Sequence, residues 1–252
     1  MYIRKIPYYI SSFLTVMFNI TNPYALLFIM LKKPSVLHFK NGASFLMTHP
    51  SDVLITKETL FDDVYRVHKL EKANTIVDVG GGIGEFSIMC ALKFPHASIY
   101  AFEPDKKSFD ILTKNVEINR CANISAIPKA VGKKKHYTLY ISEENDRSST
   151  AVGKGERAYV KGVRIQEITK KPIDLLKIDV EGAELDVLQS IREDSYRQIA
   201  CIVLEFHNYL LKNVDMQVKK FLEQREYQCE ISYDPYNASI GYIYAKRKND
   251  HP

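Results

Sequence analysis

The sequence lacks the patterns that mark cysteine-based metal sites, disulfide-rich domains and nucleic-acid-binding proteins. Its four cysteines, Cys90, Cys121, Cys201 and Cys229, are far apart and form neither a Cys-x-x-Cys motif nor a cluster with histidine. This spacing excludes a cysteine-based zinc site and indicates free thiols in a reducing compartment. The 35 basic and 30 acidic residues give a formal net charge of only +5. A charge this small and dispersed does not predict a nucleic-acid partner.

Charge is also absent from one N-terminal segment, residues 6–31, which lies between Arg4-Lys5 and Lys32-Lys33. A stretch of this length would reach across a bilayer, which takes about 20 apolar residues. However, its serine, threonine and asparagine side chains are too polar for a membrane span, and no small-residue cleavage site follows it as in a signal peptide. We therefore expect a cytoplasmic protein. A peripheral contact of residues 6–31 with a membrane surface is the alternative that this segment leaves open.

The first 70 residues are predicted to form a helical and hairpin extension. Asn22 and Pro23 are typical of an N-cap and the first turn of a helix, so they separate two helices. Asn41-Gly42 between two apolar runs predicts a hairpin turn. The expected elements are helices at residues 8–18, 23–31 and 57–66 and a hairpin at residues 36–47.

Residues 71–252 are predicted to form the main domain, because apolar strands alternate with helices from Asn74 onward. This alternation is typical of an α/β fold, a parallel sheet with crossover helices. A final antiparallel hairpin, at residues 227–232 and 240–245, is expected at one sheet edge. The other expected elements are strands at residues 75–79, 98–102, 124–127, 175–178 and 202–206 and helices at residues 85–93, 106–119, 182–191 and 214–225.

The turn after the first of these strands is rich in glycine and predicts a nucleotide site. Glycines at positions 80, 82 and 84 follow Asp78, and glycine lets a backbone turn sharply and approach a ligand closely. A dinucleotide fingerprint would need another glycine at position 85, where the chain has Glu85. The spacing instead predicts an S-adenosylmethionine site that includes Asp78, Gly80, Gly82 and Gly84.

The second strand ends in Glu103-Pro104, about 20 residues beyond the glycine turn. A carboxylate at this position can accept hydrogen bonds from both ribose hydroxyls, so Glu103 and Pro104 are predicted to contact the cofactor. The alternative is that Glu103 only caps the helix that begins near Lys106. Acidic surroundings suit a ligand with a sulfonium and an ammonium group, which favours the methyl donor over a dinucleotide.

The ends of the other strands carry the remaining candidates, because ligands of open α/β sheets bind outside the carboxyl ends of the strands. The backbone at Ala130 is predicted to line the adenine. Asp179 is predicted to contact the donor or to take the proton of an acceptor hydroxyl, and His207 is the other candidate base. Glu184 is interpreted as a helix cap. Glu205 completes the catalytic candidates; with Asp179 it would form only a poor two-carboxylate metal site, so no metal is predicted.

A longer insertion, residues 136–171, lies between the third and fourth strands. It contains a strand-like run at residues 137–141 and a polar run at residues 145–150. Its position over the carboxyl edge of the sheet indicates either a substrate lid or a plain surface loop.

Several of these segments together resemble the FkbM-type methyltransferases, over about residues 57–207. The most specific is the run from Asp174 to Glu184, Asp-Leu-Leu-Lys-Ile-Asp-Val-Glu-Gly-Ala-Glu. The other matching segments are at residues 77–86, 102–104, 115–119 and 130–132. The family implies a Rossmann-like class I methyltransferase fold, a seven-stranded sheet of order 3-2-1-4-5-7-6 whose last strand is antiparallel.

The resemblance also implies the activity, which is transfer of a methyl group from S-adenosylmethionine to a hydroxyl of a sugar, a glycan or another small molecule. The acceptor varies within the family and does not carry over to this chain. Self-association is likewise left open by the sequence.

Three other functions are alternatives on the same fold. A nucleic-acid methyltransferase that modifies amino groups would carry an Asn/Asp-Pro-Pro-aromatic motif after the fourth strand, where this chain has Asp179-Val180-Glu181-Gly182. An NAD-dependent oxidoreductase is disfavoured by Glu85. The third alternative, a catalytically silent donor-binding protein, is left open by the sequence.

Overall fold

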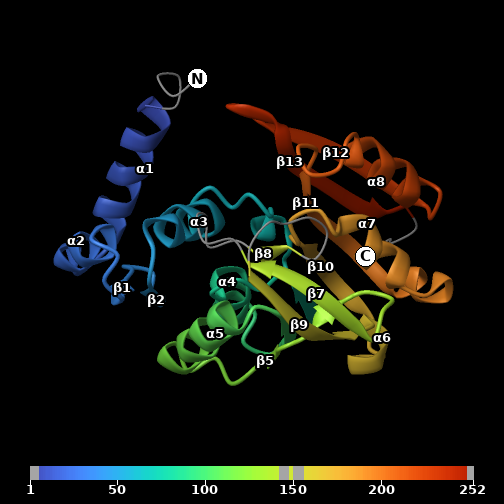
Figure 1. Cartoon of the computed structure of the whole chain (residues 1–252), viewed down its shortest axis with the longest axis horizontal. Helices are drawn as coiled ribbons and strands as arrows, with labels where there is room; N and C mark the ends of the chain where they lie inside the picture. The colour runs from blue at the N-terminus through green and yellow to red at the C-terminus, as the bar shows by residue number, and fades with distance from the viewer. Residues whose placement is uncertain (1–5, 142–147, 150–155, 249–252) are drawn as a thin grey trace.

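The computed structural model describes residues 6–141, 148–149 and 156–248, and its centre is a seven-stranded sheet of order β12-β13-β11-β10-β3-β4-β5. Five strands are parallel, and β13 pairs antiparallel with both β11 and β12 (Figure 1). When these seven strands are numbered in chain order and the sheet is read from β5, the order is 3-2-1-4-5-7-6. This is the order that the family resemblance implies, so the predicted fold is confirmed. The strands are β3 (Thr75–Val79), β4 (Ser98–Phe102), β5 (Ile124–Ile127), β10 (Ile173–Ile178), β11 (Ile199–His207), β12 (Tyr227–Asp234) and β13 (Asn237–Arg247).

Both faces of this sheet are buried. Neighbouring residues of a strand point to opposite faces, and the apolar side chains on each face pack into a separate cluster. Ile76 and Leu175 belong to one apolar cluster, which includes side chains of α3 and α4, whereas Val77 and Leu176 belong to a second cluster with α7 and α8. The crossover helices are α4 (Glu85–Lys93), α5 (Lys106–Ile118), α7 (Glu184–Ser190) and α8 (Val214–Glu223), and shorter helical turns are α6 (Ile165–Ile168), η2 (Val67–Lys69) and η3 (Glu193–Gln198).

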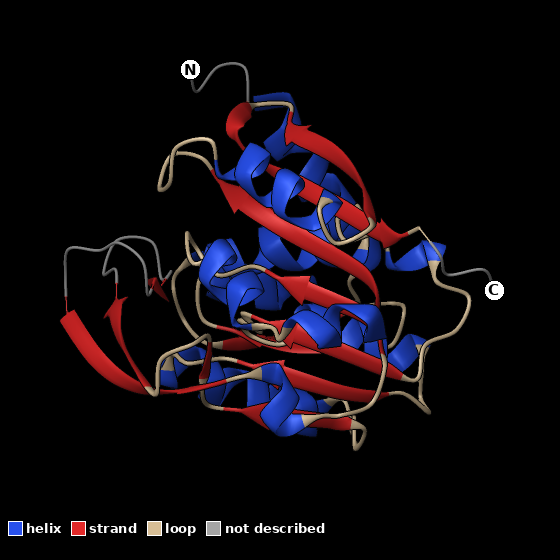
Figure 2. Ribbon diagram, turned by 90° about the vertical axis from the view of Figure 1, so that its right-hand side faces the viewer, coloured by secondary structure: helices blue, strands red, loops and turns tan. Residues whose placement is uncertain are grey.

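The predicted insertion, together with β6 just before it, forms a small second sheet of order β6-β9-β7-β8. Its long strands β7 (His136–Ile141) and β9 (Glu156–Val163) pair antiparallel and project from the body of the molecule (Figure 2). The shorter strands are β6 (Ala130–Val131) and β8 (Ser148–Ser149). Apart from β8, the polar run at residues 145–150 lies outside the described residues. The sequence indicated β7 but not β9.

The N-terminal extension forms one end of the molecule (Figure 1). It consists of α1 (Ile6–Asn19), α2 (Pro23–Met30), the hairpin β1 (Ser35–His38) and β2 (Ser44–Met47), and α3 (Pro50–Leu60). Two asparagines one turn apart, Asn115 on α5 and Asn119 at its C-cap, attach this hairpin to the main domain. Asn115 hydrogen-bonds to the backbone N–H and C=O of Leu46, and Asn119 does the same at Ser44. These side chains therefore satisfy the backbone groups that the edge strand β2 would otherwise leave unpaired.

One local prediction for the extension was wrong, and a second was only partly right. The helix expected at residues 57–66 is α3, which begins at Pro50 because His49 and Asp52 form a capping box there, and which ends at Leu60. Asn22 is the N-cap residue of α2 and Pro23 begins the helix, as predicted, but the Asn22 side chain makes no capping hydrogen bond; it accepts a hydrogen bond from the N–H of His38 and donates one to the C=O of Val36. Asn22 thus joins the start of α2 to the hairpin.

No helix among the described residues is long and apolar enough to cross a membrane. The four cysteines are free thiols; Cys90 and Cys121 are buried, and Cys201 and Cys229 are partly buried.

Candidate active site

A cavity of about 410 Å³ opens at the carboxyl ends of the parallel strands. It lies where β3 has β4 on one side and β10 on the other, which is the switch point at which open α/β sheets bind ligands. Its lining is markedly acidic. The carboxylate residues that line it are Asp52, Glu58, Glu85, Glu103, Asp105, Glu156, Asp179, Glu181 and Glu205, against the two lysines Lys107 and Lys129.

The glycine turn brings bare backbone to this cavity. Gly80, with φ of +82°, passes so close to β10 that a Cβ at this position would lie 1.7 Å from the C=O oxygen of Asp179. No other residue can occupy this position without moving the backbone. Gly80 and Gly82 line the cavity as predicted, whereas Gly84, with φ of +95°, begins α4 and does not line it.

Glu103 follows β4, on the side of the glycine turn opposite to Asp179, which follows β10. Its carboxylate accepts hydrogen bonds from the N–H of Gly82 at 2.9 Å and of Asp105 at 2.8 Å. Burial raises the pKa of Glu103 to about 8, although these two N–H donors lower it. The capping alternative is wrong, because Asp105 is the N-cap of α5 and accepts from the N–H of Ser108. Pro104 and Ala130 also line the cavity.

Asp78 lies beneath the turn and does not line the cavity. Its carboxylate accepts a hydrogen bond from the hydroxyl of Ser87 at 2.7 Å and lies 3.1 Å from the Nζ of Lys177. Lys177 is the direct neighbour of Asp78 on the adjacent strand β10, and its Nζ also donates to the C=O of Gly80 at 2.5 Å. Burial raises the pKa of Asp78, whereas Lys177 lowers it. This buried pair therefore fixes the glycine turn from below.

Asp179 and Glu181 follow β10 and line the other end of the cavity. The Tyr65 hydroxyl donates to Asp179 at 3.2 Å, and the Tyr209 hydroxyl donates to Glu181 at 3.0 Å. Glu181 has φ of +47°, in the left-handed region that residues other than glycine adopt only at a cost of about 1–3 kcal/mol. Such a cost is typical of functional sites, where the surrounding structure holds a side chain in place.

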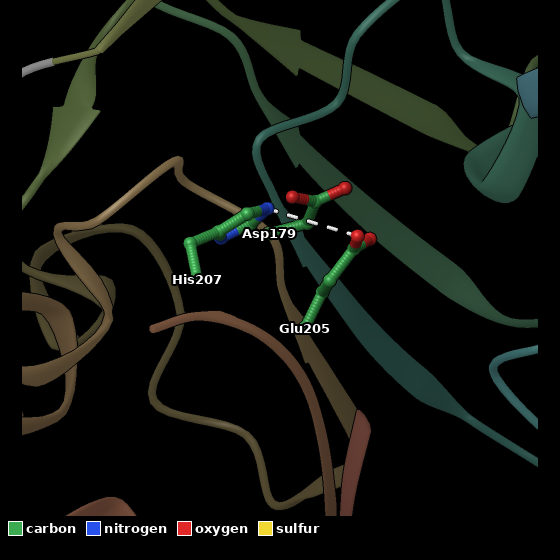
Figure 3. A group of neighbouring side chains, drawn as sticks. All are labelled: Asp179, Glu205 and His207. Carbon is green, nitrogen blue, oxygen red and sulfur yellow. Dashed lines mark ion pairs between the residues drawn. The ribbon is translucent and has the colours of Figure 1, made fainter. Parts of the chain in front are cut away.

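His207, at the end of β11, is fully buried and lies behind these carboxylates rather than on the cavity wall. Its Nδ1 donates a hydrogen bond to the buried Glu184 at 2.7 Å. Its Nε2 points towards Asp179 and Glu205 and lies 3.7 Å from Glu205 and 3.5 Å from Glu181 (Figure 3). Burial alone would lower the pKa of His207, but Glu184 and the other carboxylates raise it to about 9.

The structure therefore brings together the three predicted catalytic residues, Asp179, Glu205 and His207, at one end of the cavity. It also adds Lys177 and Glu184 to the site. Lys177 was detectable in principle, since a lysine inside an apolar strand needs a buried partner. The interpretation of Glu184 as a cap is only partly right, because its carboxylate accepts from the N–H of Gly182 as well as from His207.

The sequence model of the methyltransferase FkbM domain matches residues 78–229, which is more than half of the chain and includes every predicted site residue. The chain belongs to the FkbM methyltransferase family. It is an S-adenosylmethionine-dependent methyltransferase, as its sequence predicts.

Known proteins agree with this assignment. The chain is similar to the hexuronic acid methyltransferase AglP of Haloferax volcanii, with 26% identity over 204 residues, which cover 75% of this chain and 77% of AglP. It is 25% identical over 211 residues to the 31-O-demethyl-FK506 methyltransferase FkbM of Streptomyces tacrolimicus, covering 68% of this chain and 81% of the relative. The solved structure of methyltransferase FkbM from Methylobacillus flagellatus has the same fold, with a TM-score of 0.51 at 16% identity over 96% of this chain and 59% of the other.

The cavity fits S-adenosylmethionine in two respects. The glycine turn presents bare backbone to the cavity at Gly80 and Gly82, and the carboxylate of Glu103 accepts a hydrogen bond from the N–H of Gly82 at the end of the neighbouring strand. The acidic lining suits a ligand that carries a sulfonium and an ammonium group. When bound, the cofactor supplies a methyl group that its positive sulfur already activates for displacement.

Proposed function

We propose that the enzyme transfers the methyl group to a hydroxyl of a sugar, a glycan or another small molecule. The observation that carries this proposal is the group of carboxylates Asp179, Glu181 and Glu205 at the end of the cavity away from Glu103. An alcohol is a weak nucleophile until its proton is removed, and carboxylates beside it are the groups that accept this proton. The relatives that act on hexuronic acid and on 31-O-demethyl-FK506 support a small hydroxylated acceptor.

In this proposal, the two ends of the cavity have different tasks. Glu103, Pro104 and Ala130 bind the nucleoside part of the donor, and Gly80 and Gly82 let it lie against the backbone. At the other end, Asp179 and Glu205 orient the acceptor oxygen behind the methyl carbon and accept its proton.

His207 acts through its neighbours, because its side chain is not exposed to the cavity. It is a positioning residue that holds the carboxylates of Glu181 and Glu205, and Glu184 in turn fixes its ring. The proposed place of action is the cytoplasm, which the four free thiols support.

Calorimetric titration of S-adenosylhomocysteine tests the donor site. Wild type should bind it, Glu103→Ala should bind it at least about tenfold more weakly through loss of a charged hydrogen-bond acceptor, and NAD should not bind. Preference for NAD would refute the assignment of the glycine turn.

A panel of hydroxylated acceptors then tests the transfer. Glu205→Gln and His207→Ala should lower turnover more than donor affinity. Equal loss of donor binding in Glu103→Ala, Glu205→Gln and His207→Ala would refute the two-ended site. Donor binding without turnover of any hydroxylated acceptor would favour the catalytically silent alternative, and turnover of RNA or DNA alone would favour a nucleic-acid methyltransferase.

A further inference from the structure

Three side chains from the ends of two neighbouring strands converge at the acceptor end of the cavity (Figure 3). One carboxylate oxygen of Asp179, one of Glu205 and a ring nitrogen of His207 all lie within 4.8 Å of one another. Ligand atoms around an ion with bonds of about 2.1 Å lie roughly 3–4 Å apart. Small rotations of the two carboxylates would therefore bring all three atoms into contact with one ion.

A second observation concerns the state of His207. Its Nε2 is fully buried and lies 3.5 Å from Glu181 and 3.7 Å from Glu205, but it makes no hydrogen bond among the described residues. A buried imidazole nitrogen without a hydrogen bond is costly, and a ligand between it and these carboxylates would supply the missing contact.

The third observation is the partner on the other ring nitrogen. Nδ1 hydrogen-bonds to the buried carboxylate of Glu184, which fixes the orientation of the ring and leaves Nε2 to face Asp179 and Glu205. Histidines that bind metal ions are typically held in this way, by a carboxylate on the nitrogen that does not touch the metal.

We propose that Asp179, Glu205 and His207 bind a divalent metal ion at the acceptor end of the cavity. The inference rests on the proposed methyl transfer, since the ion would bind the acceptor oxygen and promote loss of its proton. The S–CH3 bond then breaks as the O–CH3 bond forms, the bonding electron pair stays on sulfur, and the hydroxyl proton passes to a nearby carboxylate or water. One nitrogen and two oxygen ligands suit Mn²⁺, Fe²⁺ or Zn²⁺ better than Ca²⁺ or Mg²⁺.

Titration of Mn²⁺ into protein treated with a chelator, followed by the spectrum of free Mn²⁺ in electron paramagnetic resonance, tests this site. Wild type should bind about one equivalent, and Glu205→Gln and His207→Gln should each weaken binding at least tenfold. Glu184→Gln should weaken it about 10–100-fold by releasing the ring of His207. Glu156→Gln is the matched control, because Glu156 is a carboxylate of the same cavity outside the cluster.

The same variants are titrated with S-adenosylhomocysteine to separate the two proposals. Retained donor binding with lost Mn²⁺ binding supports the metal site and shows that the variants are folded. Equal Mn²⁺ affinity in wild type, Glu205→Gln and His207→Gln overturns the metal site but not the proposed function. Failure of wild type to bind the donor overturns the proposed function instead.

A different observation, at the far end of the molecule, carries a second inference. Among the residues that the structure describes, ten of the eighteen large apolar side chains that are exposed to solvent belong to α1, α2 and the residue after α2. These two helices also bury apolar side chains against the hairpin and α3, so they are apolar on both their inner and outer faces. The exposed set, called here the apolar end, is Tyr9, Ile10, Phe13, Leu14, Phe18, Tyr24, Leu27, Phe28, Met30 and Leu31.

We infer that the apolar end inserts into the surface of an anionic lipid bilayer. At 14 and 8 residues, α1 and α2 are too short to span it, so they would lie in its interface. Exposed Lys32 and Lys33 follow α2 directly and complement anionic head groups. The exposed tyrosines Tyr9 and Tyr24 are of the type enriched at the membrane–water interface.

Flotation with vesicles of phosphatidylcholine, alone or mixed with phosphatidylglycerol, tests this surface on the full chain. Wild type should float with the mixed vesicles and less at high salt, and Leu27→Asp should reduce binding at least tenfold. Leu92→Asp is the matched control, since Leu92 is an exposed leucine on α4, away from the apolar end. Equal flotation of both variants, or none of wild type, overturns the inference. A dimer that Leu27→Asp dissociates, without vesicle binding, would show that a second copy covers the surface instead.

Discussion

Removal of the buried ammonium group of Lys177 should destabilise the protein strongly. The Nζ of Lys177 and the carboxylate of Asp78 are 3.1 Å apart and both fully buried, so Lys177→Met leaves a carboxylate without a counter-ion in the core. Their attraction is about 5 kcal/mol at an effective dielectric constant near 20. Loss of one partner of a buried pair typically costs about 3–5 kcal/mol. At about 2–4 °C per kcal/mol for a chain of this size, we expect the melting temperature to fall by about 10 °C.

The penalty of Lys177→Met should depend on pH. In the variant, Asp78 has a folded pKa above its unfolded value, because burial acts without the ammonium group. The folded state then favours protonated Asp78, so the loss of stability is largest above the folded pKa and shrinks as the pH falls through it. Urea unfolding at pH 7.5 and 5.5 should show a smaller difference from wild type at the lower pH.

The double variant Asp78→Asn/Lys177→Met is the control, because it removes both charges. It should recover at least half of the stability that Lys177→Met loses. If Lys177→Met lowers the free energy of unfolding by less than about 1 kcal/mol, or if the double variant recovers none of the loss, the Asp78–Lys177 pair does not stabilise the glycine turn.

Three further predictions concern the same site. Gly80→Ala should abolish binding of S-adenosylhomocysteine measured by calorimetry, because the added Cβ would lie 1.7 Å from the backbone oxygen of Asp179 at a φ of +82°; retained binding would contradict this geometry. Affinity for S-adenosylhomocysteine should rise up to about tenfold per pH unit as the pH approaches 8, because Glu103 has a raised pKa and must lose its proton before it accepts hydrogen bonds from the ribose hydroxyls. Glu103→Gln should flatten this pH profile of the affinity, and an unchanged slope in the variant would count against the assignment of Glu103. Glu184→Ala should lower the free energy of unfolding by about 1–3 kcal/mol, measured with urea, because Nδ1 of the fully buried His207 loses its acceptor; a change within error would argue against the pair.

Local patterns were sufficient to predict the main sheet, because each strand of the domain is a short apolar run bounded by polar residues. The site predictions also rested on a general rule, that side chains at the carboxyl ends of parallel strands meet at one edge. Asp179, Glu205 and His207 illustrate this, since they come from separate strand ends and converge in the structure.

The pairings across the sheet could not be predicted from local patterns. Lys177 supports the glycine turn only because β10 lies beside β3 in a register that places it opposite Asp78. The start of α3 was missed because the capping box of His49 and Asp52 begins the helix at Pro50, upstream of the predicted start. The role of Glu184 was missed for a similar reason, since its partner His207 is 23 residues away in sequence.

The charges of the site indicate how its two ends are related. Lys177 lies beneath the cavity, 3.1 Å from Asp78 and 4.0 Å from Asp179. Asp179, Glu181 and Glu205 gather at one end, where Nε2 of His207 lies 3.5 Å from Glu181 and 3.7 Å from Glu205, while Glu103 lies at the other end with a pKa that burial raises. When bound, the donor and a divalent ion would each bring positive charge into the same acidic cavity. Each cation lowers the negative potential that attracts the other, so binding of the donor and of the ion should be negatively coupled, each reducing the affinity for the other by the same factor. Equal Mn²⁺ affinity with and without S-adenosylhomocysteine, which lacks the sulfonium charge, but lower affinity with the positively charged analogue sinefungin, would locate that coupling at the transferred methyl group.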